Sequence, residues 1–366
     1  MIINAVRSAS LRVRLAIYCS FIIVLVAGVV WARPPTHVTI EAGPVGGSFY
    51  QIAQQYRQIL AESGIDLQIR PKANSLEILP DLANPASGID IGFEAQDASA
   101  YANAGVYSIG EVQLQPLFVF ASADLGRRIG LTDLRGRKIV MPPADSATSD
   151  AAERMLQLYD ITPDNTSFTF MQLGDAANEL RAGHFDAGVF MLAPENQVVR
   201  DLASWSGVRL VSIGEAKAIA NHLPSLRPIV LARGIYDVGD GIPPSDVVML
   251  AGTVDVAVRQ GLHPYVIYTL LEAMAQVHRG PTLVSSAGAY PSIAGVDLPV
   301  HKLAREYYRS GLPWVYGNLP PALAAFVDRY LLVALAFFVL VELYGASHYL
   351  AELGSAALTW PRSRRC

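Results

Sequence analysis

A glycine-rich segment at residues 43–50, Gly-Pro-Val-Gly-Gly-Ser-Phe-Tyr, is the clearest candidate for chemistry in the sequence. It lies between a predicted strand at 38–42 and a predicted helix at 48–63, with Ser48 as the expected N-cap. Glycine lets a backbone approach a ligand closely, and a helix N-terminus presents unpaired N–H groups with a partial positive charge. The pattern indicates a site for a carboxylate or phosphate, although a purely structural turn has the same pattern. The candidate contacts are Gly46, Gly47, Ser48, Phe49 and Tyr50.

Other predicted strands end in residues of the same kind. Asn74 and Ser75 open a helix after a strand at 67–70, and the segment Ser146-Ala147-Thr148 opens a helix at 148–159. Such residues are also ordinary N-caps, but three helix starts from two parts of the chain could converge on one anion. Three further candidates follow the strands predicted at 89–93 and 185–191: Gln96, Asp97 and Pro194.

The common motifs of catalysis and metal binding are missing from the sequence. None of the seven histidines is paired with another histidine or a cysteine at metal-ligand spacing, and no G-x-S-x-G elbow, P-loop or G-x-G-x-x-G occurs. We therefore expect a binding protein rather than an enzyme, without a metal or cofactor.

Short strands alternate with helices throughout the middle of the chain, which predicts an α/β fold with mostly parallel sheets. Two such sets are joined by strand-like segments at 117–121 and 247–258, which predicts two lobes with a hinge and a ligand cleft between them. We expect a first lobe at 37–120 and 250–316 and a second lobe at 121–249. Further helices are expected at 97–103, 176–182, 195–204, 264–278 and 300–309.

The order of the motifs resembles the TAXI family of TRAP-transporter solute-binding proteins. The similar segments are 46–50, 74–78, 92–97, 133–139, 180–187 and 299–308. The resemblance implies a type II periplasmic-binding-protein fold, a ligand such as glutamate or 2-oxoglutarate, and a separate TRAP permease. The family's Gly-Ser-Gly-Thr loop is replaced here by Asp145-Ser146-Ala147-Thr148, so a degenerate site is an alternative.

Two apolar segments at the ends of the chain indicate the membrane. Residues 15–32 are uncharged and follow Arg7, Arg12 and Arg14, a pattern typical of a cleaved signal peptide or an uncleaved anchor within residues 1–36. Residues 330–351 are interrupted by Glu342 and His348. We favour a second transmembrane helix within a C-terminal segment 317–366 over an amphipathic helix that lies on the membrane or docks on the domain.

The basic residues before the apolar segment at 15–32 predict that the acidic middle of the chain is exported. The whole chain is 52% apolar, but residues 33–328 carry 21 Lys and Arg against 30 Asp and Glu, a net charge of −9. An acidic, exported domain is a poor partner for nucleic acid. We expect a solute-binding protein tethered to the bilayer of a bacterial inner membrane, with its main domain periplasmic. The alternative is a membrane-bound ligand sensor or scaffold, in which Glu342 contacts a membrane partner.

Overall fold

The computed structural model describes residues 18–95, 98–126 and 129–358 of the chain. These residues form two compact units. The larger unit consists of residues 35–311, and the smaller one of the described residues before 35 and after 311.

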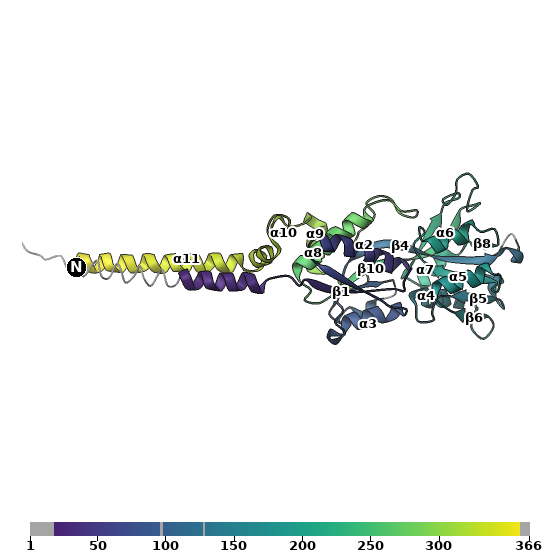
Figure 1. The fold of residues 1–366 in the computed structure, drawn as a ribbon, viewed down its shortest axis with the longest axis horizontal. Coiled ribbons are helices and arrows are strands. Elements are labelled where there is room, and N and C mark those ends of the chain that lie inside the picture. The colour runs from purple at the N-terminus through teal and green to yellow at the C-terminus, as the bar shows by residue number, and fades with distance from the viewer. Residues whose placement is uncertain (1–17, 96–97, 127–128, 359–366) are drawn as a thin grey trace, which may run out of the picture. The chain divides into compact units, whose positions relative to one another are not determined.

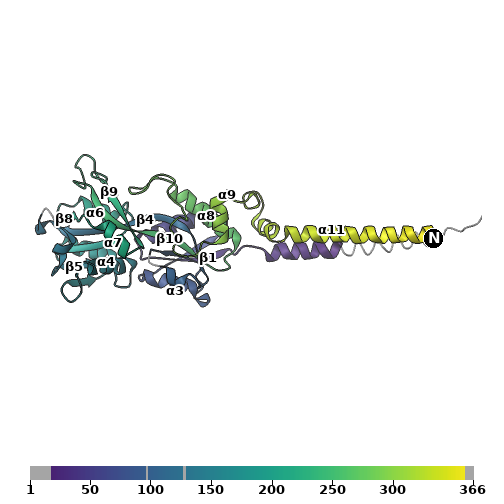
Figure 2. The same ribbon diagram turned by 180° about the vertical axis from the view of Figure 1, so that it is seen from behind.

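The first lobe of the larger unit is built on a parallel sheet. Its strands β1 (His37–Ala42), β2 (Asp66–Pro71) and β3 (Ile91–Glu94) pair in the order β2-β1-β3. Helices α2, α8 and α9 cover one face of the sheet and α3 covers the other, as Figure 1 and Figure 2 show from opposite sides. Their bounds are α2 (Ser48–Glu62), α3 (Ile78–Ala83), α8 (Pro264–His278) and α9 (Lys302–Ser310).

The second lobe repeats this arrangement. Strands β5 (Lys138–Met141), β6 (Ser167–Phe170) and β7 (Ala187–Met191) are parallel in the order β6-β5-β7. β5 and β7 are apolar and almost fully buried, as expected for strands covered on both faces. The remaining elements are α4 (Ala147–Gln157), α5 (Leu173–Arg181), α6 (Gln197–Ser204), α7 (Ala216–His222), β8 (Val208–Leu210) and β9 (Leu226–Leu231).

Two long strands connect the lobes. β4 (Val106–Ser122) pairs with β10 (Val247–Arg259) through residues 106–116 and with β7 through residues 117–121. β10 also pairs with β3 through residues 255–258 and with β9 through residues 247–252, so the described strands form one continuous 10-stranded sheet. The predicted two-lobe α/β fold with two strand crossings is confirmed. The boundaries of the lobes, placed at 120/121 and 249/250, stay a prediction.

The structure corrects several details of the predicted elements. The helix expected at 97–103 is, in its described part, only a 3₁₀ turn at Ser99–Tyr101. The strand expected at 117–121 is the last part of the 17-residue β4, whose polar first part gave no clear strand pattern. Helices α7 and α10 (Trp314–Asn318) are too short to show a helical period and were not predicted.

The smaller unit contains two apolar helices. The N-terminal helix spans Tyr18–Trp31 in its described part, and α11 spans Pro321–Leu358, longer at both ends than the predicted 330–351. Within the described residues, one helix segment, Pro321–Tyr344, is long and apolar enough to cross a membrane. The two helices pack antiparallel, because the ring of Phe21 stacks on Phe337 at 4.2 Å and Gly28 lies against Phe326.

Candidate ligand pocket between the two lobes

The glycine-rich loop connects β1 to the N-terminus of α2. The N-cap is Gly47 rather than Ser48, and no side chain caps the helix, which corrects the sequence prediction. Gly46 has φ +85°, a conformation that favours glycine, so this residue shapes the turn. The N–H groups of Ser48 and Phe49 have no acceptor within the described part of the chain. The loop therefore presents free donors, as an anion site requires.

The segment after β2 brings a hydroxyl group toward the second lobe. Asn74 uses its Oδ1 to accept from the backbone N–H of Leu76 at 3.1 Å, so its side chain is a local cap. The next residue, Ser75, accepts a hydrogen bond at its Oγ from the backbone N–H of Ala147 at 3.0 Å. Ser75 is thus a bridge between the lobes.

The start of α4 supplies the second-lobe side of the site. Ser146, in the segment predicted to open this helix, is its N-cap, and its Oγ accepts from the backbone N–H of Ser149 at 3.2 Å. The N–H of Ala147 is used by Ser75, whereas the N–H of Thr148 has no acceptor among the described residues. The N-terminus of α4 therefore keeps one free backbone donor.

Two more hydrogen bonds cross between the lobes at the glycine-rich loop. The backbone N–H of Ala193 donates to Ser48 Oγ at 3.1 Å, and Asn196 Nδ2 donates to the carbonyl oxygen of Gly46 at 3.4 Å. Together with the Ser75–Ala147 bond, they connect the two lobes beside the glycine-rich loop.

A pocket lies where these segments meet. Its volume is about 580 Å³, counted with the open space at its mouth. Seven of the predicted site residues line it: Gly47, Ser48, Phe49, Ser75, Ser146, Ala147 and Thr148. The pocket thus brings together residues from three helix starts, as the sequence suggested.

Four predicted site residues that the structure describes, Gly46, Tyr50, Asn74 and Pro194, are not part of the pocket lining. Gly46 is exposed, Tyr50 is half-buried, and the side chain of Asn74 caps its own turn. Pro194 is buried next to Ala193 but does not line the pocket. Gln96 and Asp97 lie outside the described residues.

Sequence reasoning missed the polar and apolar walls of the pocket. Gln115 on β4 is 3% exposed, and its Nε2 has no hydrogen-bond partner within the described part of the chain. Leu173, Met191 and Leu192 form an apolar wall from the second lobe. Since β4 pairs with the distant β10, no local pattern marks Gln115 as a site residue.

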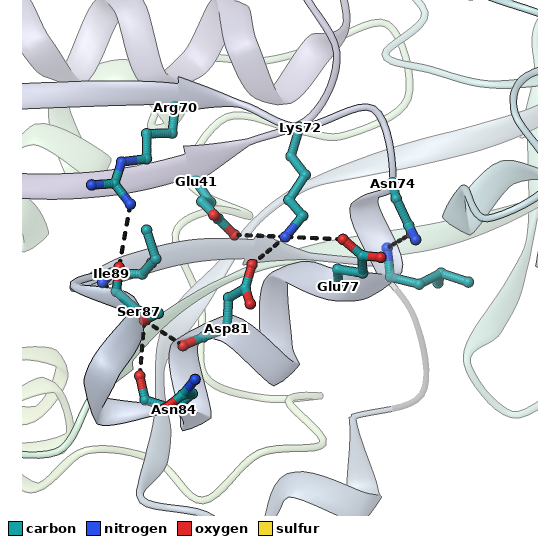
Figure 3. Close-up of polar contacts among 10 residues, drawn as sticks. Glu41, Arg70, Lys72, Asn74, Glu77, Asp81, Asn84, Ser87 and Ile89 are labelled. Carbon is teal, nitrogen blue, oxygen red and sulfur yellow. Dashed lines mark hydrogen bonds and ion pairs between the residues drawn. The ribbon is translucent and has the colours of Figure 1, made fainter.

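Lys72, which directly follows β2, contacts three carboxylates, as Figure 3 shows. Its ammonium group lies 3.0 Å from Glu77 and 3.9 Å from Glu41 and also bonds to Asp81. Burial lowers the pKa of Lys72, but its hydrogen bonds to Asp81 and Glu77 outweigh that effect and the pKa is raised. Burial raises the pKa of Glu41 to about 7. The charge of this lysine is therefore offset by carboxylates.

A search of the described residues finds no group of three or more histidine, cysteine, aspartate or glutamate side chains that could hold a metal ion. The chemistry that the pocket offers is hydrogen bonding from backbone N–H groups, hydroxyls and one amide, next to an apolar wall. These groups suit the binding of a small polar ligand.

Several solved structures are similar to this chain. An alkanesulfonate-binding protein from Xanthomonas axonopodis pv. citri, bound to MOPS, is 16% identical with a TM-score of 0.42, covering 68% of this chain and 76% of its own. An ancestral arginine-binding protein bound to arginine is 12% identical with a TM-score of 0.44, covering 68% and 95%. A histidine kinase sensor domain with similarity to periplasmic binding proteins is 17% identical with a TM-score of 0.41, covering 66% and 90%.

The comparison with protein families gives a match over most of the chain. Residues 40–310 match the NMT1-like family, and this range includes both lobes and every residue that lines the pocket. The chain therefore belongs to the NMT1-like family.

Proposed function

We propose that this protein is a membrane-tethered, extracytoplasmic solute-binding protein that captures a small organic anion between its two lobes. The observation that carries the proposal is the convergence of the N-termini of α2 and α4, one from each lobe, on a single pocket. A ligand held by both lobes favours their closed arrangement, because it makes its full set of contacts only when they are together.

The tether is the antiparallel pair of the N-terminal helix and α11, which we call the helical hairpin although the whole larger unit lies between them in the sequence. The hydroxyl of Tyr18 donates a hydrogen bond to the carboxylate of Glu342, which gives this acidic side chain a partner among apolar residues. An antiparallel hairpin returns the chain to its starting side of the bilayer. Both ends are basic, with Arg7, Arg12 and Arg14 at one and Arg362, Arg364 and Arg365 at the other, as expected for a cytoplasmic side.

The resemblance to the TAXI family supports a role in delivering the ligand to a separate TRAP-type permease. The hairpin supplies too few spans for a transport path of its own, so a permease partner is needed. The alternative is a membrane-bound ligand sensor or scaffold with a degenerate binding site, in which Glu342 contacts a membrane partner. The hydrogen bond from Tyr18 gives Glu342 one partner within the same chain and does not bear on the degenerate site.

Calorimetry of the full chain in lipid nanodiscs tests the proposal, using a panel of monocarboxylates, dicarboxylates, sulfonates and amino acids. We expect saturable binding of at least one compound and a matching rise in the thermal unfolding temperature. The absence of binding and of any thermal shift across the panel would contradict a solute-binding role.

A further inference from the structure

We propose that the pocket selects a small monocarboxylate with an apolar chain over dicarboxylates and amino acids. The inference rests on the proposed function, because it concerns the ligand of the same pocket. It differs from the glutamate-like or 2-oxoglutarate-like ligand that the resemblance implied.

The positive potential in the pocket matches one negative charge. The N-terminus of a helix carries an effective charge of about +0.5. Two helices of 15 and 11 residues, α2 and α4, begin at the pocket lining. Their combined potential, about one positive charge by the same principle, balances a single carboxylate.

Hydrogen-bond donors for that carboxylate come from both lobes and from the hinge. The backbone N–H groups of Ser48, Phe49 and Thr148, all in the first turn of a helix, have no acceptor among the residues that the structure describes. Gln115 lies on β4 opposite Gly252 of β10 and lines the pocket, and its buried amide nitrogen has no partner among the described residues. A buried polar group without a partner is rare in proteins. A ligand oxygen would satisfy it.

Among the described residues of the pocket lining, a second charged group on the ligand finds no counterpart. None of the described residues that line the pocket is Asp, Glu, Lys, Arg or His. A second carboxylate or an α-ammonium group would therefore lose its hydration without gaining an ion pair, which is strongly unfavourable. The ammonium group of Lys72, which directly follows β2, is already bound by Glu77 and Asp81.

The remaining wall of the pocket suits an alkyl chain. Leu173, Met191 and Leu192 line it from the second lobe, and the ring of Phe49, stacked on Phe93 at 5.4 Å, lines it from the first. Burial of methylene groups against such side chains is favourable. The volume of about 580 Å³, mouth included, limits the ligand to a small molecule.

The test compares ligands that share a five-carbon skeleton. The full chain in nanodiscs is titrated with pentanoate, glutarate and 2-aminopentanoate, and then with glutamate and 2-oxoglutarate. We expect pentanoate to bind at least tenfold more tightly than each of the others. Equal or tighter binding of a doubly charged compound would overturn this inference and leave the proposed function standing. If no compound of the wider panel binds, both are wrong.

A pair of glutamine variants tests the role of the pocket amide. Gln115→Met removes the donor at similar volume and should weaken pentanoate binding about tenfold. The matched control is Gln113→Met, two residues away on β4, whose Nε2 is also buried without a partner but does not line the pocket. The control should bind pentanoate as the unmodified chain does. Thermal unfolding verifies that both variants fold, and equal affinities of the two folded variants would contradict the assignment of Gln115.

Discussion

Ser75 and Ala147 are joined across the lobes, since Ser75 Oγ accepts a hydrogen bond from the Ala147 backbone N–H at 3.0 Å. Ser75 belongs to the first lobe and Ala147 is the first residue of α4 in the second. The bond therefore exists only when the lobes are together. It also occupies a donor at the helix N-terminus that a ligand would otherwise use, so Ser75 acts both as a latch and as a competitor for that donor.

The first prediction concerns this latch. Ser75→Ala should destabilise the closed arrangement by about 0.5–1.5 kcal/mol, the usual net contribution of one hydrogen bond. Calorimetry should show ligand affinity lower by about two- to tenfold, because the lost hydrogen bond outweighs the backbone N–H of Ala147 that becomes available to the ligand. Hydrogen exchange at the start of α4 should become faster.

The matched control is Ser212→Ala. Ser212 Oγ also accepts from a backbone N–H, that of Val248 at 3.0 Å, but this bond does not involve the pocket. The control should leave affinity and exchange at α4 unchanged. Faster exchange in both variants would show that the effect of Ser75→Ala is general destabilisation and not loss of a latch.

The second prediction concerns the glycine-rich loop. A Cβ atom at Gly47 would lie 3.0 Å from the backbone oxygen of Pro44, so Gly47→Leu must distort the loop and fill the pocket that it lines. Binding of any ligand should be abolished. Gly46→Ala meets no neighbour but is strained at φ +85°, and should cost about 1–2 kcal/mol of stability.

A helical glycine provides the control for both loop variants. Gly174 lies in α5 with open space around its Cα, and Gly174→Ala should leave binding intact and raise stability slightly because alanine favours helices. Chemical denaturation and calorimetry measure the two effects separately. Retained ligand binding by Gly47→Leu would show that the loop is only a structural turn.

The sequence predicted the parts of the site that depend on local structure. The glycine loop and the Ser146 N-cap follow from backbone rules that act over a few residues, and seven of the residues chosen on that basis line the pocket. Gln115 could not be found in this way, because its position depends on the pairing of β4 with a strand more than a hundred residues later. The placement of Ser48 as N-cap was wrong by one residue, since the glycine before it takes the extended conformation of a cap.

The third prediction concerns pH. Asp255 on β10 is 2% exposed and lies opposite Glu94 of β3 and Glu111 of β4, with Tyr308 of α9 nearby. Burial, opposed by a hydrogen bond from Ser108 and reinforced by the charge of Glu111, raises the pKa of Asp255 to about 7. In the unfolded chain this carboxyl ionises near pH 4.

The sign of the pH effect follows from proton binding. Between about pH 4 and 7 the unfolded state has released the proton and the folded state retains it, so the free energy of unfolding falls as pH rises. The contribution of Asp255 to the unfolding temperature should therefore be more favourable at pH 5 than at pH 8, whereas burial lowers the pKa of His278 to about 4 and acts in the opposite direction. Asp255→Asn should lower the unfolding temperature at pH 5 relative to that at pH 8, whereas Asp160→Asn, at an exposed carboxylate, should not. A difference between the two pH values that is the same in Asp255→Asn and the unmodified chain would exclude Asp255 as a contributor.

The last prediction concerns the helical hairpin. If the N-terminal helix is retained, mass spectrometry of the membrane-bound protein should detect residues before Ala32, including Tyr18.

Phe21→Cys with Phe337→Cys, in a chain carrying Cys19→Ser and Cys366→Ser, should form a disulfide because these two rings stack at 4.2 Å. Val24→Cys with Phe337→Cys is the control, since Val24 is an exposed position on the same helix. Adding Tyr18→Phe should lower cross-linking, because it removes the bond to Glu342, whose contribution in a membrane is about 0.6–1.7 kcal/mol. A mature chain that begins after Ala32 would show instead that α11 alone anchors the protein and that Glu342 must find its partner elsewhere.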